Sequence, residues 1–392
     1  VAYFVEAPKF FDLNYLFLAL QALDLGALGK GVKPGLSRAD AYELTLSIPP
    51  LPEQHRIVAK VDELMTLLDR LETTRTQRET TRYRLTTATL TRLTAPDTTE
   101  KDFSGHARFA LNNLDQLTSR PDQIKVMRQT ILNLAVRGQL VKQDPQDEPA
   151  LDYLLGLCEV STKKRKQLKP LNPSDCGGDL PESWVWLSLG AIIRGMDAGW
   201  SPQCENHPRS SEDEWGVLKT TAAQALAFDP MQHKLLPTKL KPRPEFQAEV
   251  GDILVTRAGP KNRVGVSCVV DVPCPRLMIS DKLIRFHVLS QLSPRYIALT
   301  LNAGFTFEQI ETAKSGMAVM QMNISQSKLR AIPIPLPPLA EQHRIVAKVD
   351  ALMALCDRLE AVLATADTTR ARLLDTTLHE SLKPSSSNRE AA

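Results

Sequence analysis

The sequence predicts an α+β protein in which a strand-rich domain with a mixed, curved sheet lies between two long helices. One observation is an amphipathic stretch of twenty residues that occurs twice, at 53–72 and 341–360, with seventeen of the twenty identical. The other is a series of short apolar runs, separated by turn residues, across about 179–335, which is the pattern of strands. A repeat at a distance of 288 residues is too widely spaced for a solenoid and indicates one duplicated module.

Each copy of the repeat is predicted to be a long helix that starts after a proline-rich segment. Residues 48–52 read IPPLP and residues 336–340 read LPPLA, and a helix can begin only at or after the last proline. Glu53 and Glu341 then complement the positive end of the helix dipole. Apolar residues follow with a 4-3-4-3 spacing, a heptad seam typical of helices that pack on helices. The seam residues are Ile57, Val61, Leu64, Leu68 and Leu71 in the first copy and Ile345, Val349, Leu352, Cys356 and Leu359 in the second.

The polar faces of the two helices also repeat. Two ordinary amphipathic helices of a core would need only the seam in common, and that reading stays open. Here Gln54, His55, Arg56, Lys60 and Asp62 recur as well in the second copy. Two like surfaces predict a shared partner or mutual pairing of the two helices.

The opening segment resembles the end of the strand-rich domain. Residues 33–50 align without a gap with residues 321–338, at the offset of the helix repeat. Residues 1–50 are therefore predicted to be the C-terminal remnant of a first copy that would start roughly 110 residues before Val1. A helix is expected at Tyr15–Leu25. The predicted divisions are 1–50 (remnant), 51–95 (first long helix), 96–178 (helical connector and basic linker), 179–335 (strand-rich domain), 336–384 (second long helix) and 385–392 (disordered tail).

Basic residues concentrate in three places. Six arginines against two glutamates between 70 and 92 indicate either a solvated helix face or a stripe that faces phosphate or a partner. The run 163–166, which follows a predicted helix at Gln123–Val141, is either an exposed linker or a contact with the DNA backbone. Residues 234–263 hold seven basic and three acidic residues, so the charge of the strand-rich domain is local.

The loop 256–263 is the candidate nucleic-acid contact. It follows a predicted strand and offers a hydroxyl, two guanidinium groups, an amine and an amide. These donors bind phosphates and the edges of guanine or adenine, although an ordinary solvated turn has the same composition. The candidate DNA-contacting residues are Lys219, Thr220, Trp200, Arg257, Lys261, Asn262 and Arg263.

Several signatures of catalysis are absent from the sequence. It has no GxGxxG or GxxxxGK[ST] motif, no Asp/Glu-x-Lys triplet and no Asn/Asp-Pro-Pro-aromatic motif, so neither a nucleotide site nor a nuclease or adenine methyltransferase site is indicated. Six cysteines without a CxxC pair fit a reducing cytosol, and no metal site is expected. No apolar run has membrane-spanning length and the net charge is +3, so a protein of the cytoplasm without a membrane partner is predicted.

The chain resembles the specificity subunit of type I restriction-modification systems. The match covers nearly the whole chain, except that most of a first target-recognition domain is missing. It is carried by Pro49–Gln54 with the helix after it and the second copy from Pro337, and by Ile131–Val141, Leu180–Trp186, Gly251–Leu254 and Ile279–Asp281.

The resemblance implies a pseudo-two-fold repeat in which long antiparallel coiled-coil helices separate two target-recognition domains. Such a chain reads half of a bipartite double-stranded DNA target and is not an enzyme by itself. It implies partners, two methyltransferase subunits and the restriction or translocase subunits, which carry S-adenosylmethionine, ATP and Mg²⁺. A truncated or regulatory subunit that reads one half-site, alone or paired with another truncated chain, is an alternative, and a structural coiled-coil adaptor is a third reading.

Overall fold

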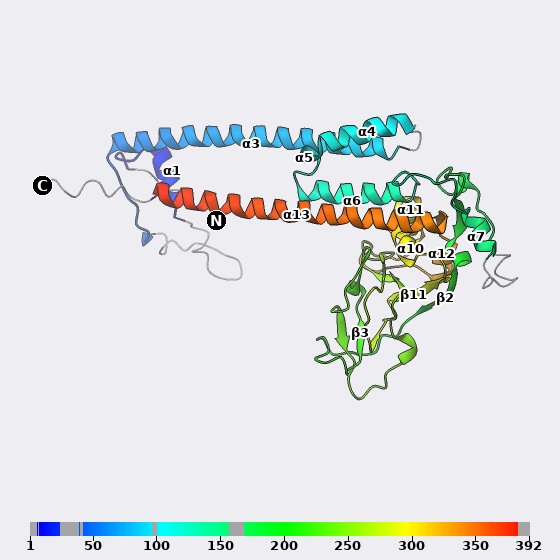
Figure 1. The fold of residues 1–392 in the computed structure, drawn as a ribbon. Helices are drawn as coiled ribbons and strands as arrows, with labels where there is room; N and C mark the ends of the chain where they lie inside the picture. The colour runs from blue at the N-terminus through cyan, green and yellow to red at the C-terminus, as the bar shows by residue number, and fades with distance from the viewer. Residues whose placement is uncertain are drawn as a thin grey trace. The chain divides into compact units, whose positions relative to one another are not determined.

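The fold is seen in a computed structural model that describes residues 6, 8–23, 39, 42–95, 100–156 and 168–382 (Figure 1). The basic run 163–166, the tail 385–392 and much of the predicted remnant lie outside these residues. The chain forms two compact units, Val1–Arg84 and Leu85–Ala392, and each is described by itself. The predicted divisions placed the whole first helix in one part, whereas the unit boundary falls inside this helix.

The first unit joins a short helix to the start of a long one. Helix α1 (Leu13–Gln21) starts two residues before the predicted helix at Tyr15–Leu25 and covers its N-terminal part, and the Asp12 side chain caps α1 by accepting from the Tyr15 amide at 2.9 Å. Helix α3 (Leu51–Leu93) begins one residue earlier than predicted, before the last proline, so that Pro52 lies in its first turn. The buried Gln54 ties the two together, because its Oε1 accepts from the Asp12 amide at 2.7 Å and its Nε2 donates to the Phe10 and Pro49 carbonyls.

The second unit contains the strand-rich domain, whose main sheet is antiparallel. The strand order is β2-β11-β7-β9. Ile253 and Val255 of the central strand belong to one core with the covering helix α10, whereas Leu254 belongs to a second core on the other face. An apolar run of this kind is expected for a strand that is buried on both faces. The strands are β2 (Ile193–Ala198), β11 (Leu283–Val288), β7 (Ile253–Thr256) and β9 (Ser267–Val269).

A second, mixed sheet and several two-stranded ribbons complete this domain. Strand β3 pairs in parallel with β10 and antiparallel with β6, so the predicted mixed sheet is present. The smaller strands are β10 (Leu277–Met278), β3 (Gly216–Leu218), β6 (His233–Leu235), β4 (Ala223–Gln224), β5 (Ala227–Phe228), β8 (Ala258–Gly259) and β12 (Met322–Asn323). The short helices are α9 (Leu189–Ile192), α10 (Pro294–Leu301), α11 (Gly304–Ala313) and α12 (Gln326–Ala331).

The ribbon β1–β13 closes the domain and leads into the second long helix. Strand β1 (Val185–Ser188) pairs antiparallel with β13 (Pro333–Leu336), and α13 (Leu339–Leu382) follows directly. The Tyr296 hydroxyl donates to the Pro335 carbonyl at 2.8 Å, which fixes α10 to this joint. The strand-rich domain therefore lies against the N-terminal part of α13 (Figure 1).

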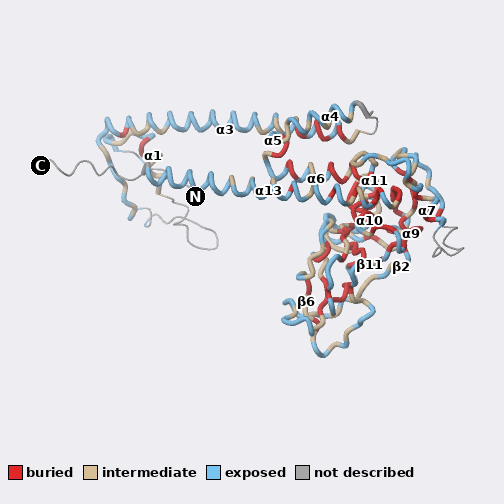
Figure 2. The backbone as a smooth tube through the Cα atoms, in the orientation of Figure 1, coloured by how far each residue is buried: buried red, intermediate tan, exposed pale blue. Residues whose placement is uncertain are grey.

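Helix α6 (Pro121–Ala135) runs alongside α13 (Figures 1 and 2), and three of the five seam residues of α13 are buried. Ile345, Val349 and Cys356 are 0%, 2% and 2% exposed, in one core with Ile124 and Ile131 of α6. Arg128 of α6 adds ion pairs to the Asp357 and Glu360 carboxylates of α13 at 2.6 and 3.0 Å. The two like surfaces predicted a shared partner or mutual pairing of the two helices, and α6 is a partner for α13 that the sequence did not predict.

The seam of the first copy lies in a different environment. Leu64, Leu68 and Leu71 are 48%, 56% and 58% exposed. Mutual pairing of the two seams therefore stays a prediction, and it is not what buries the second seam.

The connector is more helical than the division into connector and linker implied. Helix α6 ends at Ala135, short of the predicted Val141, because Gly138 adopts a left-handed backbone with φ of +71°. A Cβ atom there would come within 2.6 Å of the Pro181 ring, so only glycine fits. The remaining connector helices are α4 (Glu100–Asn112), α5 (Leu114–Leu117) and α7 (Ala150–Gly156).

Among the residues that the structure describes, no helix combines the length and apolar character needed to cross a membrane.

Candidate nucleic-acid interface

A pocket of about 290 Å³ opens in the strand-rich domain, and three lysines line it. Lys219 follows strand β3, Lys234 lies in the neighbouring strand β6, and Lys282 precedes strand β11. None of the three has an ion-pair partner among the described residues, so the pocket carries uncompensated positive charge. The other lining residues are Ser201, Pro202, Cys204, Val217, Leu218, Thr220 and Ser280.

Backbone contacts fix the direction in which this lining is presented. The Lys219 amide donates to the Gln232 carbonyl at 2.9 Å, which holds the end of β3 beside the turn before β6. Thr220 then starts a short 3₁₀ turn, Thr220–Ala222. We call this lining, with Lys219, Lys234 and Lys282 at its centre, the lysine cleft.

Ser280 gives the lysine cleft an unsatisfied polar group. Its side chain is 7% exposed, and its hydroxyl has no hydrogen-bond partner among the described residues. A buried hydroxyl without a partner costs free energy, about 1–3 kcal/mol. Such a group suits a ligand oxygen or nitrogen. One carboxylate lies at the rim, that of Asp281, and it is paired with the Ser201 hydroxyl.

The loop 256–263 adjoins the lysine cleft. The Arg257 amide donates to the Lys282 carbonyl at 2.7 Å, so this loop and the strand entering β11 run side by side. Lys261 and Asn262 are exposed and Arg257 is half-buried, and no hydrogen-bond partner of these side chains is found in the described part of the chain. The structure thus brings Lys219, Thr220, Arg257, Lys261 and Asn262 into one region.

Arg263 has a different environment from the rest of that loop. Its guanidinium donates to the Thr220 carbonyl at 2.6 Å, to the Ala223 carbonyl at 2.9 Å and to Gln224 Oε1 at 2.8 Å. Because both of its terminal nitrogens are occupied inside the protein, Arg263 is suited to hold the Thr220 turn. The loop composition suggested a DNA contact for Arg263, and these bonds point instead to a positioning role.

Trp200 directly precedes Ser201 of the lysine cleft, and its contacts in the structure are with protein groups, so a DNA contact by Trp200 stays a prediction. Its ring packs against a small core that contains Val217 and Met278. The guanidinium of Arg243 lies over the ring, 4.4 Å from its centroid, in a cation–π arrangement. Trp200 therefore supports the wall of the cleft and orients Arg243.

Sequence reasoning missed Lys234, Arg243, Ser280 and Lys282. Two of them fall in the basic stretch 234–263, which was noted only for its net charge. The others fall in or next to the segment Ile279–Asp281, one of the family landmarks. None has a local pattern that separates it from an ordinary surface residue, because the pocket is assembled from three strands.

Two charged side chains of the strand-rich domain, Asp252 and Arg285, are largely buried and form ion pairs inside the protein. Burial raises the pKa of the Asp252 carboxyl, while the Glu249 amide, His287 and Arg285 favour its charged form. Arg285 also binds Asp197 at 2.9 Å and the Gln247 carbonyl at 2.6 Å. Within the described residues, no group of three or more His, Cys, Asp or Glu side chains could hold a metal ion.

Comparison with known proteins shows which proteins this chain is similar to. Residues 241–365 match the family model described as type I restriction modification DNA specificity domain. The specificity subunit of the type I restriction enzyme EcoEI from Escherichia coli is 41% identical over 379 residues, which are 93% of this chain and 64% of that protein. The EcoAI specificity subunit, also from Escherichia coli, is 26% identical over 84% of this chain and 56% of its own length.

The solved structures give a weaker likeness. The HsdS subunit from Thermoanaerobacter tengcongensis superposes with a TM-score of 0.40 at 21% identity, over 93% of this chain and 68% of that one. The chain spans less than two thirds of the length of the curated relatives it matches. The sequence matches make the chain similar, over most of its own length, to type I restriction enzyme specificity subunits, and residues 241–365 match the DNA specificity domain.

Proposed function

We propose that this chain is the DNA specificity subunit of a type I restriction-modification complex, and that residues 179–335 read one half of a bipartite duplex target. The observation that carries the proposal is the lysine cleft together with the adjoining loop 256–263. Three uncompensated lysines beside exposed hydrogen-bond donors match a polyanion that also presents base edges. Its family relatives are named specificity subunits.

The residues divide into two roles. Lys219, Lys234 and Lys282 neutralise backbone phosphates, and the Ser280 hydroxyl supplies a further donor inside the cleft. Arg257 and Asn262 have the fork and amide geometries that recognise guanine and adenine edges. Phosphate contacts set the register of the domain on the duplex, and base contacts then specify the sequence.

The proposal assigns chemistry to partners rather than to this chain. Two methyltransferase subunits, with S-adenosylmethionine, and restriction subunits, with ATP and Mg²⁺, would dock on the long helices. Support comes from the repeated polar faces, because His55 and Lys60 in the first copy and His343 and Lys348 in the second are all exposed. Identical exposed surfaces suit identical partners. The location proposed for such a complex is the cytoplasm, where the DNA is.

The cleft is tested by removing two of its charges. The Lys219→Ala/Lys282→Ala variant of the full chain, purified with its co-purifying subunits, is titrated against a fluorescent 30-base-pair duplex at several salt concentrations. Each lost phosphate contact should make the slope of log affinity against log salt less steep by about 1. The double variant should therefore have a slope that is less steep by about 2. The control is Lys125→Ala, an exposed lysine on α6 outside the strand-rich domain.

An affinity and a salt slope that stay at wild-type values in the double variant would exclude the lysine cleft as a DNA site. A second variant, Arg257→Ala/Lys261→Ala, addresses the loop. It should weaken DNA binding while the methyltransferase subunits still co-purify, since the loop is not part of the long helices. Loss of those subunits would show that the loop serves assembly instead.

A further inference from the structure

A short hairpin beside the loop 256–263 exposes an apolar tip. Residues 315–323 form this hairpin, in which Ser315 and Asn323 pair across its base. Met317 is 108% exposed, and Val319 and Met320 are each 68% exposed. Scattered apolar residues on a surface need no explanation, but three within four positions at one tip form a patch. We call Met317, Val319 and Met320 the apolar tip.

The hairpin is anchored to the candidate DNA-contacting loop by several bonds. Strand β12 of the hairpin pairs antiparallel with β8 of the loop. The Lys261 amide donates to the Val319 carbonyl at 2.7 Å. From below, the buried Lys314 donates through its Nζ to the Lys261 carbonyl at 2.8 Å and also contacts the Glu311 carboxylate. The apolar tip and Lys261 are therefore parts of one fixed structure.

The backbone of the tip is itself a tight turn. The Gln321 amide donates to the Ala318 carbonyl at 2.9 Å. A Cβ atom on Gly316 would lie 2.3 Å from the Gln321 carbonyl oxygen, so this close approach requires glycine. Since the turn is closed by its own backbone, the exposed side chains are not needed to hold it. Their exposed apolar surface is therefore free to contact a ligand.

The apolar tip continues the surface that begins at the lysine cleft. The Ile324 amide donates to the Arg257 carbonyl at 2.9 Å, and the Arg257 amide donates to the Lys282 carbonyl at 2.7 Å. Three neighbouring segments thus run in order from the cleft, through Arg257, to the hairpin. The tip is flanked by cations on the side of the cleft, so the ligand that covers it also carries negative charge.

We propose that the apolar tip contacts thymine methyl groups in the major groove and makes this hairpin a sequence-reading element. The inference rests on the proposed DNA-binding function. The C5-methyl group of thymine is the apolar group that base edges present in the major groove, and the phosphates of the two backbones border this groove. A fixed apolar tip that is bonded to Lys261, on a hairpin whose base is bonded to Arg257, matches both features. Met317, the most exposed of the three, makes the contact, and Val319 and Met320 flank it.

The test removes the methyl group of thymine from the DNA and, separately, the methionine side chains from the apolar tip. The full chain, in the complex in which it is purified, first selects its preferred sequence from a random-core duplex pool. Duplexes of that sequence are then made with uracil in place of each thymine in turn. Removing a methyl group that the tip contacts should weaken wild-type binding about fourfold, from roughly 0.8 kcal/mol per buried methylene-sized group. The Met317→Gln/Met320→Gln variant should bind the thymine and uracil duplexes equally.

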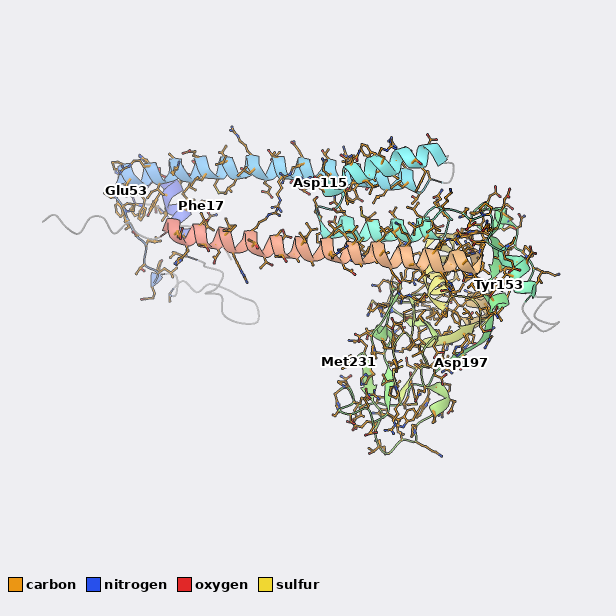
Figure 3. All side chains as sticks on the ribbon, in the orientation of Figure 1. Phe17, Glu53, Asp115, Tyr153, Asp197 and Met231 are labelled. Carbon is orange, nitrogen blue, oxygen red and sulfur yellow. The ribbon has the colours of Figure 1, made fainter. Side chains whose placement is uncertain are left out.

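Two controls separate this contact from general effects. Met231→Gln changes another methionine, also 68% exposed, in the connection between β5 and β6 (Figure 3), and should keep the preference for thymine. Lys261→Ala should lower the salt slope by about 1 for every duplex, whereas the double methionine variant should leave that slope unchanged.

The possible outcomes are distinct. The proposal is wrong if wild type does not distinguish thymine from uracil at any position, or if the double variant keeps the wild-type preference. Loss of co-purifying subunits from the double variant, with an unchanged selected sequence, would make the tip a protein contact and also overturn it. If wild type selects no sequence at all, the proposed DNA-reading function itself fails.

Discussion

The two copies of the repeated helix have nearly the same sequence and very different surroundings. In the second copy, Ile345, Val349 and Cys356 are buried in a core shared with α6 and the strand-rich domain, and Glu341 is buried against Trp184. In the first copy, Glu53 and the leucines of the seam are exposed. The helix sequence alone therefore does not decide burial. The neighbouring elements decide it, here α6 and the strand-rich domain.

One part of the repeat is used in the same way in both copies. Gln54 accepts from the amide of Asp12, the residue that caps α1, and Gln342 accepts from the amide of Ser293, the residue that caps α10. Tyr15 and Tyr296 each donate a hydroxyl hydrogen bond to a carbonyl that precedes the long helix. These tyrosine bonds span 32 residues in the first copy and 39 in the second. The contact between the short helix and the start of the long helix, which we call the joint, is therefore built in the same way in both copies. The chain segment between the two bonded residues differs in length.

The two copies should differ most in how Ile345→Ala and Ile57→Ala change the free energy of unfolding. Ile345 is 0% exposed in a packed core, so its truncation should lower the free energy of unfolding by about 2–5 kcal/mol. All four tryptophans lie between 184 and 215, so tryptophan fluorescence during urea unfolding reports the second unit. Ile57→Ala should leave that transition unchanged. Equal shifts for the two variants would mean that the copies share one core.

A smaller and more symmetric effect is expected at the two joints. Gln342→Ala leaves the buried Ser293 amide without its acceptor, and Gln54→Ala does the same to the Asp12 amide. An unsatisfied buried donor costs about 1–3 kcal/mol. Hydrogen exchange at the Ser293 and Asp12 amides should therefore accelerate roughly tenfold or more, each only in its own variant. If only Gln342→Ala has an effect, the joint of the first copy is not closed in solution.

Elements with a local signal were predicted well from the sequence. The prolines before each long helix and the heptad spacing after them locate α3 and α13, which begin at Leu51 and Leu339. The apolar runs at 252–256 and 282–288 became β7 and β11 almost unchanged. In the apolar stretch 264–270, Gly265 turns the chain with φ of +85°, and only Ser267–Val269 forms a strand.

Features that depend on distant segments could not be predicted. The pairing of β1 with β13 joins Trp186 to Pro335, and the lysine cleft gathers residues 219, 234 and 282. Nothing near any of these residues in the sequence marks the others. The same limit explains Arg263. The composition of its loop suggested a DNA contact, but the carbonyls that accept its hydrogen bonds lie about 40 residues earlier in the chain.

The last contrast between the copies concerns Glu341 and pH. Burial raises the pKa of the Glu341 carboxyl above its usual 4.5, although Trp184 Nε1 at 2.9 Å, Gln143 Nε2 at 2.7 Å and nearby Arg344 oppose the shift. A raised pKa means that the folded state binds the proton more tightly than the unfolded state. The stability that this group contributes is therefore fully present below pH 4.5 and is lost as pH rises through the folded pKa.

We expect Glu341→Gln to remove the pH dependence of stability that this carboxyl causes. The unfolding free energy of the variant should therefore increase relative to that of wild type as the pH rises from 4.5 towards neutrality. Urea unfolding followed by tryptophan fluorescence at a series of pH values measures it. Glu53→Gln, the matched change in the first copy, is the control and should not alter the tryptophan transition, because every tryptophan lies in the other unit. A difference profile for Glu341→Gln that is flat with pH would mean that the bonds from Trp184 and Gln143 fully offset the burial of this carboxylate.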